Sequence, residues 1–214
     1  MCGIIAIVRR RTTRSLPDGQ DLLDRCAAAV AGLPSAGDPD LGAALATSAT
    51  ALADVDRELR GEAGLRAMMA DRSLVSGRSA LMADASASLQ AIEQHLDVVG
   101  ASLSDLEAVN ASLIRAKDAT WSIERDRLRT ARAVADMADR DPSAASVAAF
   151  LSVQQALSAL DRLEVRGRDS AGVHVLVRNH GLDLDDPTVA RVVAERQADP
   201  LFTDGAVRTP DGQL

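Results

Sequence analysis

The feature that most constrains the fold is a stretch of about 130 residues, from Gln20 to Ala149, whose apolar residues recur at helical spacing. Aromatic residues make up only 1% of the chain, with one Trp, two Phe and no Tyr. Alanine, leucine and arginine dominate this stretch instead, and these residues favour helices over strands. The stretch therefore predicts an antiparallel helical bundle or a coiled-coil hairpin.

Turn signals divide this stretch into separate helices. We expect helices over Gln20–Gly32, Pro39–Arg60, Leu65–Val99, Ser102–Arg140 and Ala144–Leu163, with "GEAG" at residues 61–64 as a break. The longest one has a heptad-like seam formed by Leu106, Val109, Leu113, Ala116, Thr120 and Ile123. His95 and Trp121 are interpreted as packing residues. The helical region thus supplies its own apolar faces and shows no ligand site.

The two ends of the chain have a different pattern. The run "GIIAIV" (Gly3–Val8) is β-branched and apolar, which predicts a buried strand. In "VHVLV" (Val173–Val177), valines at every second position predict another strand. A short helix is expected near Thr188–Gln197, followed by a loop or hairpin. The whole chain is therefore expected to be α+β, although it is predominantly helical.

Charge and cysteine content exclude several classes of protein. The net charge of −7 argues against nonspecific nucleic-acid binding. No apolar run approaches the ~20 residues of a membrane span, and the opening residues lack the order of a signal peptide. Two cysteines, Cys2 and Cys26, form neither a disulfide framework nor a metal-ligand cluster. We therefore expect a cytoplasmic protein without a metal or cofactor, and without nucleic-acid or membrane partners.

Two short segments contain the candidate catalytic residues. Removal of Met1 would leave Cys2 with a thiol and a free α-amine on the same residue. In "RGRDSAG", Arg166 and Asp169 can form a charge-assisted pair, and Gly167 permits close approach by another group. Ser170 can hydrogen-bond within the turn. Taken alone, this segment fits a structural turn between a helix and a strand, in which Arg166 and Asp169 merely pair, better than it fits a functional site.

Together, "MCGIIAIV" and "ALDRLEVRGRDSAGV" closely resemble the class II glutamine amidotransferases, which are N-terminal-nucleophile hydrolases. The form "LEVRGRDSAG" is most similar to the glutaminase domain of the glutamine–fructose-6-phosphate aminotransferases, which make glucosamine 6-phosphate. The resemblance implies a partial αββα glutaminase domain at residues 1–11 and 145–214. Residues 12–144 would then be a helical insertion into that domain.

The resemblance also implies a mechanism with glutamine as substrate. The Cys2 thiolate would attack the γ-carboxamide, and its α-amine would act as general base and then as general acid. A γ-glutamyl thioester would form, ammonia would leave, and water would release glutamate. Arg166 and Gly167 would position the nucleophile, and Asp169 and Ser170 would fix the loop. No cofactor takes part.

The chain departs from the family in two ways. It contains no "RWATHG"-like glutamine-binding segment, no "NG" pair for the oxyanion hole and no synthase part. We therefore expect an N-terminal fragment or truncated product that is inactive by itself and lacks a C-terminal synthase partner. The helical insertion is expected to serve in docking or homo-oligomerisation. The alternative function is a helical interaction module whose amidotransferase flanks are vestigial.

Overall fold

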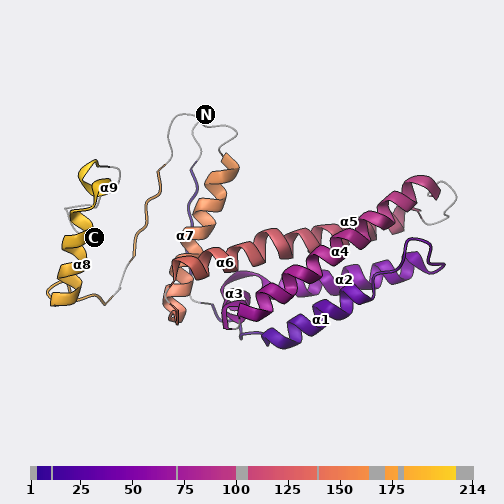
Figure 1. Ribbon diagram of the computed structural model, residues 1–214, viewed down its shortest axis with the longest axis horizontal. Helices are drawn as coiled ribbons and strands as arrows, with labels where there is room; N and C mark the ends of the chain where they lie inside the picture. Colours follow the sequence, from indigo (N-terminus) through magenta and orange to yellow (C-terminus); the bar gives the residue numbers. More distant parts are fainter. Residues whose placement is uncertain are drawn as a thin grey trace. The chain divides into compact units, whose positions relative to one another are not determined.

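A computed structural model describes residues 4–10, 12–70, 72–99, 106–138, 140–163, 172–177 and 181–205 (Figure 1). For residues 72–74, 99 and 163 the description covers the backbone alone. The chain divides into two compact units, Met1–Val173 and His174–Leu214. Each unit is described by itself.

The first unit is built from helices. They are α1 (Gly19–Ala31), α2 (Leu41–Leu59), α3 (Gly61–Ala70), α4 (Arg72–Val99), α5 (Leu106–Trp121), the π-helix η2 (Ser122–Leu128), α6 (Arg129–Met137) and α7 (Ala144–Leu163). The second unit contains α8 (Pro187–Gln197) and the short α9 (Pro200–Thr203). The predicted helices over 20–32, 39–60 and 144–163 correspond closely to α1, α2 and α7. The short helix expected at 188–197 corresponds to α8.

The prediction of an α+β fold with a partial αββα domain is wrong. The described residues form helices and irregular segments, and no strand occurs among them. Residues 4–8 and 173–177 are present as irregular, exposed segments, with Ile4 at 94% and Val175 at 55% exposure. A β-branched sequence favours an extended backbone, but a strand also requires a hydrogen-bonded neighbour. Neither segment has such a neighbour among the described residues.

The predicted break at "GEAG" is present but shorter than expected, because α2 ends at Leu59, Arg60 has an extended backbone, and α3 already begins at Gly61. Gly61 and Gly64 lie inside the first turns of α3, which begins directly after Arg60. Gly61 has a φ of 71°, a conformation that glycine adopts readily. A Cβ at Gly64 would overlap the backbone of Leu59. These glycines therefore permit a tight junction between α2 and α3.

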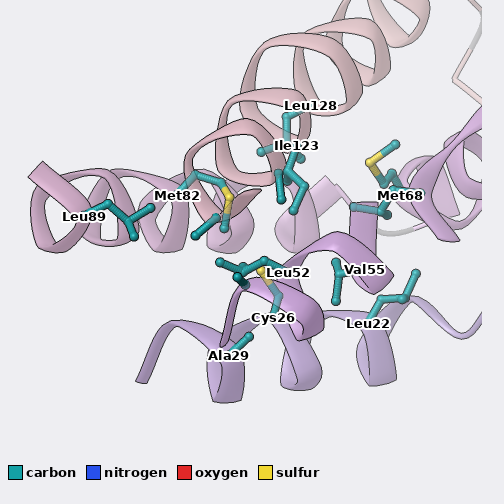
Figure 2. Packing of buried hydrophobic residues seen from close by; sticks show 14 of the residues in the cluster. Leu22, Cys26, Ala29, Leu52, Val55, Met68, Met82, Leu89, Ile123 and Leu128 are labelled. Atoms are coloured by element: carbon teal, nitrogen blue, oxygen red, sulfur yellow. The ribbon is translucent and has the colours of Figure 1, made fainter. Parts of the chain in front are cut away.

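The core lies where α1, α2, α4, α5 and η2 pack together. Helix α2 contacts α1 and α5, and α4 contacts α1, α5 and η2. Figure 2 shows how side chains from distant parts of the sequence meet there, such as Leu22, Met82 and Ile123. The predicted seam of α5 lies on this side: Val109, Leu113, Ala116, Thr120 and Ile123 are buried. The opposite face of α5 is consequently exposed to solvent.

Polar groups fix the ends of the first helices. The Asp18 carboxylate accepts hydrogen bonds from the backbone N–H groups of Gln20 and Asp21 at 2.8 and 2.9 Å, and so caps α1. At the C-terminal end of α2, the Arg14 guanidinium donates to the carbonyl oxygens of Glu58 and Arg60 at 2.8 and 2.9 Å. A cation at this position favourably opposes the helix dipole. The polar N-terminal segment is thereby attached to the bundle.

Candidate functional site

The expected catalytic residues lie outside the described part of the chain. This applies to Cys2, Arg166, Gly167, Asp169 and Ser170. The structure does describe the segments that lead to them, residues 4–10 and helix α7. The candidate site is therefore considered through these two segments and the helical bundle that separates them in the sequence.

Arg9 joins the N-terminal segment to α7. Its Nε donates to Ser152 Oγ at 2.8 Å, and a terminal nitrogen of the same guanidinium donates to Gln155 Oε1 at 2.7 Å. Burial lowers the pKa of Arg9, while the negative charge of Glu62 on α3 raises it. Arginine nevertheless remains protonated under ordinary conditions. Arg9 thus brings together residues that are more than 140 positions apart.

Segment 4–10 runs antiparallel to α7 (Figure 1). Cys2 lies seven residues before Arg9, and Arg166 lies eleven residues after Gln155. Because the two segments run in opposite directions, the N-terminal end of segment 4–10 lies toward the C-terminal end of α7. An insertion whose two ends lie close together interrupts a protein with little disturbance. Segment 4–10 and α7, which flank most of the helical region in the sequence, are thus in contact through Arg9.

The thiol that the structure does describe is that of Cys26. Cys26 lies on α1 within the core, with no exposed surface, beside residues such as Leu22 and Leu52 (Figure 2). Burial raises its pKa to about 11, and the positive charge of Arg78 on α4 opposes this only partly. Reactivity depends on the thiolate, which is scarce at neutral pH under these conditions. Cys26 is therefore a packing residue, as its place on an apolar helix face indicates.

A buried ion-pair cluster connects α2 with the π-helix. Asp56 is 2% exposed and accepts hydrogen bonds from Arg60 Nε at 3.0 Å and Arg127 Nε at 2.9 Å. Arg127 belongs to η2, so this contact joins the irregular turn to α2. A π-helical segment is uncommon and often marks a functional position. Here both guanidinium groups pair with the Asp56 carboxylate, which gives the cluster a structural role.

A shallow groove of about 430 Å³ runs along the bundle beside this cluster. It is lined by residues of α2, α5 and the start of η2: Ala53, Asp56, Arg57, Arg60, Ala111, Ile114, Arg115, Asp118, Ala119 and Ser122. Ile114 is 60% exposed, and nearby Trp121, interpreted above as a packing residue, is 54% exposed. The outward position of Trp121 could have been found from the sequence, because it lies opposite the predicted seam. This surface offers contacts to a macromolecule rather than catalytic groups.

Other kinds of site are not seen. Within the described ranges, no group of three or more His, Cys, Asp or Glu side chains is placed to hold a metal ion. Among the helices of this part of the chain, none has the length and apolar character needed to cross a membrane. Comparison with known proteins found no matching family, curated protein or solved structure.

Proposed function

We propose that the chain is the nucleophile-bearing part of a glutamine amidotransferase and that Cys2 hydrolyses glutamine. The thiolate sulfur forms a bond to the γ-carbonyl carbon, and the C–N bond breaks to release ammonia. The α-amine of Cys2 accepts the thiol proton and passes it to the leaving nitrogen. Water then cleaves the thioester, which yields glutamate and the free thiol. The ammonia is passed to an amino-sugar synthase, which transfers it to its own substrate.

One structural observation supports this proposal, beside the two sequence motifs. The Arg9 guanidinium holds the segment that follows Cys2 against the helix that precedes "RGRDSAG". The resemblance requires these two motifs to act at the same site. A helical insertion that returned the chain far from segment 4–10 would argue against such a site.

The experiment is covalent labelling with an electrophilic analogue of glutamine, 6-diazo-5-oxo-norleucine, followed by peptide mass mapping. We expect the purified chain to have lost Met1 and to carry the label on Cys2. Because the chain contains no "RWATHG"-like glutamine-binding segment, the measured quantity is the selectivity of the label for Cys2 over Cys26 and not protection by glutamine. Cys26 is an internal control, because its burial keeps it unlabelled.

Two variants complete the test. Cys2→Ala should abolish labelling by the glutamine analogue, and Cys26→Ala should leave it unchanged. Retention of Met1 would contradict the proposal, since the α-amine would then be absent from Cys2. Absence of the label from Cys2 in a chain that has lost Met1 would also contradict it, because Cys2 would then lack the reactivity of a nucleophile.

A second candidate function is that of a helical association module. It is favoured by the outer face of α5, where Ile114 and Trp121 are exposed. Trp and Arg are enriched at the centres of protein interfaces, and Trp121 and Arg115 lie within two turns of each other. Association of the helical region and hydrolysis at Cys2 concern different parts of the chain, so the two functions are separable.

A further inference from the structure

The outer face of α5 has a regular pattern of its own. Its residues follow one another at alternating spacings of four and three, and all are exposed: Glu107, Ala111, Ile114, Asp118 and Trp121. This spacing is that of a helix seam that packs against another helix. The seam on the opposite face of α5 is already buried in the bundle, so α5 has two such seams and only one is covered within the described chain.

The exposed seam is complementary to itself in an antiparallel arrangement. Ala111 and Trp121 each lie five residues from Ala116, or about 7.5 Å along the helix axis. If two antiparallel copies of α5 meet through their outer faces at the axial level of Ala116, which is itself buried on the inner face, each Trp121 lies level with the small side chain of Ala111 in the other copy. A large side chain opposite a small one is the arrangement that fills an interface without overlap.

Charge follows the same geometry. The midpoint between Arg115 and Asp118 along α5 lies within one residue of the level of Ala116. The same crossing level therefore brings Arg115 of each copy near Asp118 of the other. Both residues line the groove between α2 and α5. Neither has an ion-pair partner among the residues that the structure describes. Each is therefore available for a pair between copies.

We propose that the occupant of this face is a second copy of the chain, which forms a two-fold antiparallel dimer through α5. A two-fold interface uses the same surface on both copies, so every contact occurs twice. The inference rests on the association function and not on hydrolysis at Cys2. It adds to that function the face, the orientation and the crossing level.

The test uses the full chain and its single tryptophan. Sedimentation velocity and Trp emission are measured from about 1 µM to 1 mM protein. We expect a monomer at the lower end, a dimer at the upper end, and a shift of the emission to shorter wavelength over the same range. Trp121→Ala should raise the concentration of half-association at least tenfold. Val98→Ala, which removes an 83% exposed apolar side chain on α4, should leave it unchanged.

A charge exchange tests the orientation. Arg115→Asp and Asp118→Arg should each weaken the dimer, because each places like charges opposite one another. The double variant restores both pairs and should return the concentration of half-association to near that of the original chain. Circular dichroism checks that each variant remains helical. Since the exchange is on the surface, loss of folding does not explain a weakened dimer that the double variant rescues.

Two results would overturn the inference, and they have different meanings. A chain that remains monomeric with constant Trp emission over the whole range would overturn both the inference and the association of copies, and would leave the face to a different protein. A dimer that is unaffected by Trp121→Ala and by the charge exchanges would overturn only the inference, because association would then use another surface.

Discussion

Burial determines the state of the Cys26 thiol at the scale of single residues. Cys26 is enclosed by the core, and its pKa is raised from about 9 in the unfolded chain to about 11. The folded chain therefore binds the thiol proton more tightly than the unfolded chain does. This difference stabilises the fold below about pH 9, and the stabilisation is lost as the pH rises towards 11.

The first prediction follows from this difference in pKa. The free energy of unfolding should fall by about 2–3 kcal/mol between pH 9 and pH 11, as measured by urea denaturation. In Cys26→Ala the same interval should show a distinctly smaller fall, although the variant begins from a lower stability because a buried sulfur atom is missing. If the free energy of unfolding falls by the same amount between pH 9 and pH 11 in both proteins, Cys26 does not titrate as proposed.

Asp56 provides the second prediction at this scale. Asp56→Ala leaves Arg127, which is largely buried, without its carboxylate, whereas Arg60 can turn towards solvent. We expect a loss of about 2–4 kcal/mol in the free energy of unfolding. The matched control is Asp54→Ala, because Asp54 pairs with the exposed Arg57 at 2.7 Å and should cost less than about 1 kcal/mol. Equal losses for the two variants would contradict a structural role for the buried cluster.

At the scale of the elements, two glycines in helices have opposite requirements. A Cβ at Gly64 in α3 would overlap the backbone of Leu59, but a Cβ at Gly77 in α4 would meet only the Leu23 side chain at 3.6 Å. Gly64→Ala should therefore lower the free energy of unfolding by about 2 kcal/mol or more. Gly77→Ala should raise it by about 0.5–1 kcal/mol, because alanine is the better helix former. Chemical denaturation of both variants checks the sign of each change.

The helices could be predicted from the sequence, but several of their relations could not. Periodicity and breakers located α1, α2 and α7, and the seam of α5 was predicted on its buried side. The break predicted at "GEAG" is limited to its start, and the segment itself begins α3, because Gly64 permits a close backbone approach that depends on the position of Leu59 in space. Ile4 and Val175 follow β patterns, yet pairing depends on a neighbour that local sequence does not specify. The expected catalytic residues remain a prediction, because they lie outside the described residues.

At the scale of the whole molecule, the helical region brings separate parts of the sequence together. Arg9 contacts α7 after the chain has passed through six α-helices and the π-helix. The sequence did not indicate this contact, because neither Ser152 nor Gln155 belongs to a motif. These two partners of Arg9 are evident only from the course of the chain through the bundle. The support for the proposed role of Cys2 depends on this contact, and the contact can be measured without an assay of activity.

The last prediction is that Arg9 holds segment 4–10 against α7. Spin labels are attached at Val8→Cys and Leu157→Cys, both at exposed positions, in a chain whose native cysteines are replaced by alanine. With Arg9 present, pulsed electron spin resonance should give one narrow distance distribution. Arg9→Gln should broaden it, because the side chain then lacks both the positive charge and the reach to bond Ser152 and Gln155 together. The control is the neighbouring exposed Arg10→Gln, which should leave the distribution narrow. If Arg9→Gln leaves the distribution as narrow as Arg10→Gln does, the segment is held by other contacts, and the supporting argument for a shared site of the two motifs is lost.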